Sequence, residues 1–376
     1  MKKNSYVLDA RTTTDHFPGI GRYVSNLGQA MATQLLPNEE LLFLQNPGET
    51  SDHWQMPTTA NINTIVMEKT ISPFSIRQQW AIPQQLHQHQ ATMYHSPYYL
   101  MPYRPKVPTV VTIYDLIPQL FPQTVSLQAR LLSRLATRLA LRSANHIIVI
   151  SETTRRDLLA AFPIQPEKVT AVPLAPDPIF QPQPESTILQ IRHKYNLPET
   201  YALYLGSNKP HKNLVRLLEA WKIIIDEQEN PPQLIIAGAW INRYPEPQQK
   251  AAEFGIENAV QFLGPIPEAD LAALYSSAAL FVFPSLYEGF GLPVIEAMAC
   301  GTAVSCANSS SLPEIGSDAA HYFDPTNVRE MATVIGRLLA NDSLRFELEE
   351  KGKTQAQNFS WKKAANSTLQ IYRHIT

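Results

Sequence analysis

Two glutamates, Glu288 and Glu296, stand eight positions apart around a glycine-containing turn in the second half of the chain. An apolar run, Phe281–Phe283, leads into this turn, and the turn is expected to open a helix. Backbone N–H groups at such a helix start bind phosphate. Carboxylates so close to a phosphate would repel it and need other partners, and sugar hydroxyls donate hydrogen bonds to carboxylates. The stretch therefore indicates a site for a sugar nucleotide.

A second loop, Gly206–Asn213, carries positive charge between an expected strand and an expected helix. Gly206 is expected to free the turn, and Asn213 is expected to cap the helix. Lys209 and Lys212 would stabilise the charge that grows on a leaving diphosphate as its bond to a sugar breaks. The alternative is an ordinary solvated loop, in which lysine is common.

A third loop, residues 15–23, follows the first expected strand and contains Gly19-Ile20-Gly21. It resembles a dinucleotide-binding fingerprint, but Val24 occupies the place of the third glycine, and the next strand ends at Gln45 rather than at an acid. NAD binding is therefore disfavoured. A flexible loop whose backbone approaches phosphate or sugar remains open, and a tight strand-to-helix turn explains the glycines nearly as well.

The histidines and cysteines offer weaker signals. His95 leads into an aromatic-rich loop that could meet an acceptor, and His16 could lie in the same region, although a hydrogen-bonded structural histidine is the more common case. Cys300 and Cys306 have neither disulfide nor metal spacing, so both are expected to be buried thiols in a reducing compartment. The sequence has no Asp-x-Asp run and no His/Cys cluster with ligand spacing. We therefore expect no metal ion and no other cofactor.

Length and charge narrow the class of protein. The 376 residues suffice for two domains, and a hydrophobic content of 44% can fill two cores. A net charge of −2 argues against a nucleic-acid partner. No N-terminal stretch is apolar enough for a signal peptide, and no run is long enough to span a bilayer. The chain is expected in the cytoplasm, or peripheral to the inner face of the membrane.

Short apolar runs alternate with helical patterns in both halves, which indicates α/β domains with parallel sheets. In the first half we expect strands at 6–8, 41–44, 62–66, 91–94, 109–113, 146–150 and 169–172, helices at 21–36, 127–142 and 153–162, and mostly loop with one interrupted helix over 72–108. In the second half we expect strands at 202–205, 233–237, 260–263, 280–283 and 303–306, helices at 214–225, 248–254, 269–277 and 293–300, and then a helical tail with breaks near Asn341 and Phe359.

Five prolines lie between Pro173 and Pro184, a density that excludes regular structure. Residues 173–186 are therefore expected to link a first domain, 1–172, to a second, 187–357. A C-terminal helix over 358–376 is expected to pack back toward the first domain. Two doubly wound domains of this kind would face each other across a cleft at the carboxyl ends of their strands.

Taken together, these motifs resemble those of the retaining glycosyltransferases of family 4, which have the two-domain GT-B fold. The resemblance covers almost the whole chain. Its most specific part is the stretch from Glu288 to Gly301, followed by Gly206–Asn213, and it is supported by Gly19–Tyr23 and Thr112–Asp115.

The resemblance implies a role for each motif. Lys212 would bind the donor diphosphate, Glu296 the donor ribose and Glu288 the hydroxyls of the transferred hexose, while Gly19-Ile20-Gly21 would close over the phosphates. The other donor-binding residues would be Gly206, Ser207, Lys209 and His211 near the phosphates, Phe290, Gly291 and Leu292 through their backbone N–H groups, and Gly264, Ile266 and Glu268 around the base.

Two positions depart from the family pattern. Members often have an arginine beside the diphosphate lysine, and here only Lys209 and His211 could replace it. Many members carry histidine where this chain has Tyr114, and a tyrosine donates a hydrogen bond without carrying positive charge at neutral pH. Either Tyr114 and Asp115 position the reaction differently, or activity is reduced or absent. Asp115 is the acceptor-side residue of greatest interest, and the predicted catalytic residues are Glu288, Lys212, Asp115 and Tyr114.

One expected helix is basic and amphipathic. Its arginines recur every four residues and alternate with leucines, which would suit a surface of anionic lipid. The alternative is a helix that covers the sheet and keeps a solvated outer face. The arginines are Arg130, Arg134, Arg138 and Arg142.

We expect the chain to transfer a hexose, mannose or glucose, from a nucleoside diphosphate sugar to a sugar or lipid-linked acceptor. The similarity leans toward GDP-mannose users in surface-polysaccharide synthesis. Retention of the anomeric configuration follows from the resemblance alone, and the lack of an obvious carboxylate nucleophile favours front-face substitution. The alternatives are a sugar-nucleotide epimerase or a phosphorylase of the same architecture, and a non-catalytic sugar-nucleotide binder.

Overall fold

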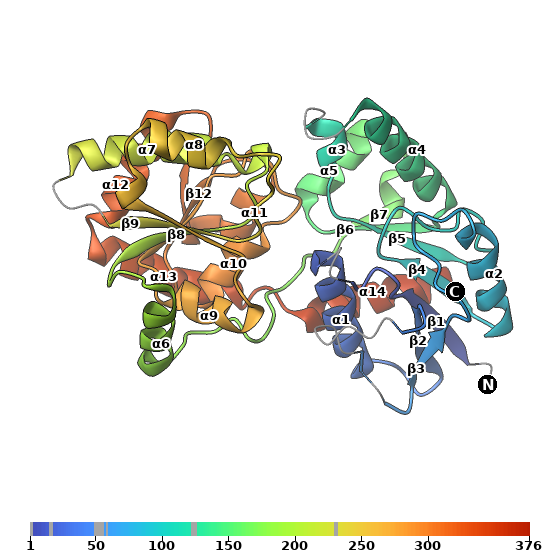
Figure 1. Cartoon of the computed structure of the whole chain (residues 1–376). Coiled ribbons are helices and arrows are strands. Elements are labelled where there is room, and N and C mark those ends of the chain that lie inside the picture. The colour runs from blue at the N-terminus through green and yellow to red at the C-terminus, as the bar shows by residue number, and fades with distance from the viewer. Residues whose placement is uncertain (1–2, 15–17, 49–55, 58, 122–125, 229–231) are drawn as a thin grey trace. The chain divides into compact units, whose positions relative to one another are not determined.

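The computed structural model describes residues 3–14, 18–48, 56–57, 59–121, 126–228 and 232–376. The chain forms two compact units, one of Met1–Leu174 with Ser360–Thr376 and one of Ala175–Phe359 (Figure 1). His16 lies outside the described residues, so its predicted role stays a prediction. Within the described ranges, no helix is both long and apolar enough to cross a bilayer.

The first unit is built on a parallel sheet. Its described residues form seven strands in the order β3-β2-β1-β4-β5-β6-β7, so the order reverses between β1 and β4. Loops that leave the carboxyl ends of strands on either side of such a reversal diverge and leave room for a ligand. The strands are β1 (Asn4–Asp9), β2 (Glu39–Gln45), β3 (Ile62–Val66), β4 (Met93–Ser96), β5 (Thr109–Ile113), β6 (His146–Val149) and β7 (Val169–Ala171).

The middle of this sheet is shielded from water on both faces, whereas its edge strand β3 is partly exposed. Every residue of β5 is buried, as expected of a parallel strand that is covered on both faces. The last helix of the chain belongs to this unit: its Arg373 guanidinium donates to both oxygens of Glu39 at 2.7 and 2.8 Å. The helices of the unit are α1 (Pro18–Ala32), α2 (Gln78–Gln88), α3 (Ile117–Leu120), α4 (Leu127–Ser143), α5 (Glu152–Ala161) and α14 (Trp361–Ile375).

The second unit repeats the architecture. Its described residues form a parallel sheet in the order β10-β9-β8-β11-β12-β13, which reverses between β8 and β11. The strands are β8 (Tyr201–Leu205), β9 (Gln233–Ala237), β10 (Val260–Gly264), β11 (Leu280–Phe283), β12 (Val304–Ala307) and β13 (His321–Phe323). The helices are α6 (Glu185–Tyr195), α7 (Leu214–Glu227), α8 (Glu246–Glu253), α9 (Glu268–Ser276), α10 (Leu292–Ala299), α11 (Leu312–Gly316), α12 (Val328–Leu339) and α13 (Asp342–Ala356).

Each unit is thus a Rossmann-like α/β domain, which confirms the predicted fold class. Some predicted elements were wrong in detail. Helix α1 begins at Pro18, whose fixed φ suits a first helical position, so Gly19-Ile20-Gly21 form a helical turn rather than a loop. Helix α6, which was not predicted, begins directly after Pro184, inside the end of the predicted linker. Strand β13 was not predicted either, and it interrupts the expected helical tail.

Candidate functional site

Two loops flank the point where the strand order of the second unit reverses. One joins β8 to α7 and contains Lys212 in a short 3-10 turn, Pro210–Lys212. The other joins β11 to α10 and contains Glu288. Because β8 and β11 are neighbours in a parallel sheet, both loops leave from the same edge. The two strongest sequence motifs are therefore brought together.

Lys212 and Glu288 form an ion pair at the centre of this edge. The Lys212 ammonium donates to Glu288 Oε1 at 2.6 Å and lies 5.2 Å from the centre of the Phe283 ring. Ser285 Oγ donates to the same carboxylate oxygen. The side chains of Lys212 and Glu288 are 15% and 12% exposed, so both are held in place and both remain accessible to a ligand.

Further hydrogen bonds fasten the two loops to each other. The Leu286 N–H donates to the His211 carbonyl at 2.7 Å. Asn213 Nδ2 donates to the carbonyls of Pro284 at 3.1 Å and Pro325 at 2.7 Å. The prediction that Asn213 caps α7 with its side chain was wrong: Asn213 Oδ1, the atom that would cap, accepts from Arg216 Nη1 at 2.9 Å instead, and the backbone of Asn213 has φ of 63°.

Gly206 is required for space rather than for a special turn. A Cβ at this position would lie 2.7 Å from the Tyr204 hydroxyl. The same hydroxyl donates to the Ser207 carbonyl at 2.7 Å, and this hydrogen bond fixes the first residues of the loop. The prediction that Gly206 is needed for a flexible turn was wrong. The structure shows instead that a larger residue would clash with the Tyr204 hydroxyl.

Free backbone N–H groups stand at the start of α10. Gly291, the residue before the helix, has φ of 114°, a conformation that favours glycine, and no side chain caps the helix. Within the described chain, no hydrogen bond uses the N–H groups of Phe290, Gly291 or Leu292. Unpaired N–H groups at a helix start, together with the helix dipole, are able to bind an anion, so anion binding by these groups stays a prediction.

Serine hydroxyls form hydrogen bonds with the backbone of the Glu288 loop. Ser310 Oγ accepts from the Glu288 N–H at 2.9 Å. Ser311 Oγ donates to the carbonyls of Glu288 at 3.0 Å and Phe290 at 2.6 Å. Sequence reasoning missed these residues and Ser285. The available signal was the run Ser309-Ser310-Ser311, which follows the neighbouring strand β12 at the same edge.

Glu296 lies one turn into α10 and is almost fully buried. The Tyr275 hydroxyl of α9 donates to its Oε2 at 3.1 Å. The proposed base-contacting residues sit further along the edge: Gly264 ends β10, Glu268 begins α9, and Ile266 lies between them. The structure thus places all of these residues on one unit, at the carboxyl edge or in the helices that start there.

His211 cannot replace the missing arginine. It is buried, and burial first, then the charge of Lys212, lowers its pKa to about 4. The side chain is therefore neutral near pH 7, and the idea that it adds positive charge was wrong. Lys209, by contrast, is exposed and can add charge to the loop.

In the first unit, Tyr114 and Asp115 follow the carboxyl end of β5. The Tyr114 hydroxyl is buried without a hydrogen-bond partner in the described chain, and its ring packs edge-on against Tyr23 of α1 at 5.5 Å. Burial, and to a lesser extent the charge of Tyr23, raises the Tyr114 pKa, so the phenol stays neutral. Asp115 Oδ1 accepts from the Ile117 N–H at 2.8 Å at the start of α3.

His95 is a hydrogen-bonded structural histidine, which was the alternative to a contact with the acceptor. Its Nδ1 lies 2.6 Å from the Tyr372 hydroxyl, and its Nε2 lies 2.8 Å from Thr112 Oγ1. Burial lowers its pKa to about 3. Because the ring is fully buried and neutral, an acceptor sugar cannot contact it. The sequence had suggested such a contact for His95 and the aromatic-rich loop that follows it.

Cys300 and Cys306 are buried free thiols. Burial raises the pKa of both, that of Cys300 to about 12, so neither is a thiolate near neutral pH. Among the described residues, no three His, Cys, Asp or Glu side chains come together in a group that could hold a metal ion.

Two family models match the chain. The model for glycosyl transferases group 1 matches residues 187–355, and the model for glycosyltransferase family 4 matches residues 18–178. The O-antigen chain mannosyltransferase B of Escherichia coli is 30% identical over 372 residues, 94% of this chain and 96% of that protein. A serotype-specific mannosyltransferase of the same species is 29% identical over 236 residues, which are 62% of this chain but only 29% of that protein.

Solved structures show the same fold at lower identity. Sucrose-phosphate synthase from Thermosynechococcus elongatus superposes with a TM-score of 0.76 at 21% identity and 99% coverage of both chains. The Anabaena protein Alr3699/HepE in complex with UDP and glucose gives 0.76 at 18% identity, over 99% of this chain and 100% of that one. The chain belongs to the family 4, group 1 glycosyltransferases and has their GT-B fold, as its motifs predicted.

Proposed function

We propose that this glycosyltransferase moves a hexose from a nucleoside diphosphate sugar to a sugar or lipid-linked acceptor, with retention of the anomeric configuration. Mannose is the first candidate, because a relative that matches over 94% of this chain and 96% of its own length is a mannosyltransferase. The observation that carries the proposal is the Lys212–Glu288 pair at the strand-order reversal, beside three unused backbone N–H groups.

The chemistry of the donor fits the groups at this edge. A diphosphate is attracted to the Lys212 ammonium and to the N–H groups of Phe290, Gly291 and Leu292. The hydroxyls of the hexose donate to Glu288, whose carboxylate is oriented by Ser285. We assign the ribose to Glu296 and the base to the segment from Gly264 to Glu268, as the family pattern implies.

The transfer step needs charge stabilisation more than a nucleophile of the protein. The bond between the hexose C1 and the β-phosphate oxygen breaks, and the leaving diphosphate takes the electron pair. The acceptor oxygen forms the new bond to C1 from the same face, and its proton passes to the leaving phosphate. Lys212 and the helix start stabilise the diphosphate as its charge increases, a role that needs no metal ion. Tyr114, as a neutral phenol, and Asp115 are proposed to position the reactants.

A thermal-shift panel of GDP-mannose, UDP-glucose, the free nucleotides and free mannose tests donor binding. A ligand at a hundredfold excess over its Kd adds about 2.7 kcal/mol, which is about 5–10 °C in the Tm of a unit of this size. We expect the true donor to give the largest shift and free mannose to give none. If no nucleotide or sugar nucleotide raises the Tm, the proposed donor site is wrong.

Product analysis then tests the reaction. Purified protein is incubated with the best donor and a mannose-terminated oligosaccharide, and the product linkage is determined by NMR. An α-linked product from an α-linked donor supports retaining transfer. A new sugar nucleotide formed without acceptor would instead indicate an epimerase, and tight donor binding without any product over a panel of acceptors would indicate a non-catalytic binder.

A further inference from the structure

The two carboxylate oxygens of Glu288 are used differently. The Lys212 ammonium, at 2.6 Å, and the Ser285 hydroxyl both donate to Oε1. In the part of the chain that the structure describes, no hydrogen bond uses Oε2. A hexose hydroxyl can therefore donate to Oε2 while the ion pair stays intact. Binding of a sugar nucleotide does not require Lys212 and Glu288 to separate.

Three side chains beside this ion pair carry no charge. The Phe283 ring has its centre 5.2 Å from the Lys212 ammonium. His211 is neutral near pH 7 because its pKa is about 4. Burial, and to a lesser extent the charge of Glu288, raises the pKa of the Tyr204 hydroxyl, so this phenol is neutral as well. None of the three adds to the charges of the pair, which are one cation and one carboxylate.

The other cation of the loop, Lys209, lies in a different setting. It lines a pocket of about 540 Å³ together with Arg216, Glu219 and Glu246, and neither partner of the ion pair lines this pocket. Two cations and two carboxylates thus share the pocket, and their charges offset each other. A diphosphate at the strand-order reversal is therefore attracted mainly by the ammonium of the ion pair and by the N–H groups at the start of α10.

Transfer of the hexose would change the charge that faces Glu288. In a sugar nucleotide each phosphate carries one negative charge, and the hexose is proposed to lie between the β-phosphate and the carboxylate. The leaving diphosphate takes the electron pair of the broken bond, and its terminal phosphate, with a second pKa of about 6, carries about one further charge near pH 7. Once the hexose has left with the acceptor, this phosphate and Glu288 share the single ammonium of Lys212. Both partners of the pair are largely shielded from water, so like charges repel each other strongly there.

We propose that Glu288 also discriminates against the free nucleoside diphosphate, so that the site retains the donor and releases the product. The inference rests on the proposed function and deepens it, because the carboxylate has a second role besides binding the hexose. A carboxylate that only oriented Lys212 would support the binding of both ligands to the same extent. Opposite effects on donor and product therefore distinguish the two roles.

The test compares donor and product on the same protein. Isothermal titration calorimetry of the full chain gives the Kd of GDP and of GDP-mannose, and likewise of UDP and UDP-glucose. Glu288→Gln removes the charge but keeps an amide oxygen that can accept from Lys212 and Ser285. Because the repulsion is lost, this variant should bind the free nucleotide about tenfold more tightly. It should bind the sugar nucleotide about tenfold more weakly, because hydrogen bonds to a carboxylate are stronger than hydrogen bonds to an amide.

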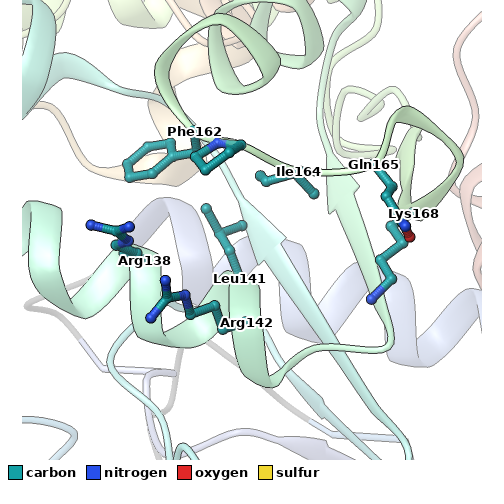
Figure 2. A pocket seen from close by; sticks show the side chains of 8 residues that line it. Arg138, Leu141, Arg142, Phe162, Ile164, Gln165 and Lys168 are labelled. Carbon is teal, nitrogen blue, oxygen red and sulfur yellow. The ribbon is translucent and has the colours of Figure 1, made fainter.

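Two control variants remove charges elsewhere. Glu227→Gln removes an exposed acid at the opposite end of α7 from the Lys212 loop and should leave every Kd unchanged. Cations outside the site could also attract a nucleotide: Figure 2 shows Arg138, Arg142 and Lys168 around a pocket of about 340 Å³ in the first unit. Arg138→Ala/Arg142→Ala should therefore bind both ligands like wild type. Circular dichroism checks that each variant is folded.

The outcomes separate this inference from the proposed function. If Glu288→Gln binds the free nucleotide no more tightly than wild type does, the inference is overturned, whereas the donor site stands as long as wild-type protein binds the sugar nucleotide. An equal gain in Glu227→Gln would show a general effect of net charge, and loss of nucleotide binding in the arginine variant would place the measured binding in the first unit. Either result also overturns the inference. If wild-type protein binds neither ligand, the proposed function fails with it.

Discussion

At the strand-order reversal of the first unit, Asp9, Arg11 and Tyr94 form a buried polar network, whereas at the reversal of the second unit Lys212 and Glu288 form a pair that water still reaches. Arg11 Nη2 lies 2.6 Å from Asp9 Oδ2, and the Tyr94 hydroxyl donates to the same oxygen at 2.5 Å. The side chains of Arg11 and Asp9 are only 1% and 3% exposed.

The difference shows how similar sheets use charge for two purposes. Arg11 also donates to the Ile71 carbonyl at 3.1 Å, so the buried network joins β1, β4 and a distant loop through groups that all have internal partners. The Lys212–Glu288 pair has fewer partners and lies beside unused N–H groups, so a ligand can add to it. We infer that the first pair maintains the fold and that the second serves the reaction.

The largest expected effect comes from breaking the buried pair. Asp9→Ala leaves the Arg11 charge in the interior without its carboxylate, which should cost about 3–5 kcal/mol of unfolding free energy. Urea unfolding followed by circular dichroism measures the loss. The double variant Asp9→Ala/Arg11→Met removes both charges and should recover part of it. A loss below about 1 kcal/mol in Asp9→Ala would mean that the network is not structural.

The second effect is on activity rather than on stability. Lys212→Ala removes the cation proposed to stabilise the leaving diphosphate, so kcat/KM should fall about 10²–10³-fold. The unfolding free energy should change much less than in Asp9→Ala, because both partners of the pair are partly exposed. Steady-state kinetics with the donor from the panel measures the first quantity and urea unfolding the second. Lys222→Ala, on the exposed face of α7, is the control. A drop of less than about tenfold in Lys212→Ala would remove this residue from the reaction.

Acid should destabilise both units through their buried histidines. His95 has a pKa of about 3 in the fold, whereas the unfolded chain takes up this proton near the ordinary value of 6.5. Between these values only the unfolded state is protonated, so the unfolding free energy falls with falling pH by about 1.4 kcal/mol per pH unit. His211 lowers the unfolding free energy in the same way as the pH falls from 6.5 to its own pKa in the fold, about 4.

The variant His95→Gln should lose the contribution of this residue to the pH dependence, whatever its stability at neutral pH. Urea unfolding between pH 6.5 and pH 4.5 measures the slope. His87→Gln, on an exposed position of α2, should keep the wild-type slope. An unchanged slope in His95→Gln would mean that His95 is protonated in the folded protein.

The sequence predicted four strands at their observed bounds because their short runs are rich in β-branched and other apolar residues. Ile62–Val66, Thr109–Ile113, Gln233–Ala237 and Leu280–Phe283 begin and end where expected. It also marked Lys212 and Glu288 as separate candidates. Their pairing could not be predicted, because the residues are 76 positions apart and meet only through the order of the strands.

Predictions failed where tertiary contacts override local preference. Asn213 has a typical capping side chain, but its amide nitrogen donates to Pro284 and Pro325, and in this orientation its Oδ1 accepts from Arg216 rather than from the first turn of α7. His211 stands beside two lysines in the sequence, and burial nevertheless keeps it neutral. Burial depends on the packing of the whole unit, so no local pattern could have shown either outcome.

The smallest expected effect tests whether the reaction depends on the orientation of Glu288 in the Lys212–Glu288 pair. Ser285→Ala removes one hydroxyl that orients Glu288 without removing any charge, so kcat/KM should fall about tenfold, the equivalent of about 1.4 kcal/mol. Ser305 is the matched control, since it is a buried serine on β12 whose hydroxyl has no hydrogen-bond partner in the described chain. Ser305→Ala should leave kcat/KM unchanged. Equal losses in the two variants would show that serine burial, and not the contact with Glu288, determines the effect.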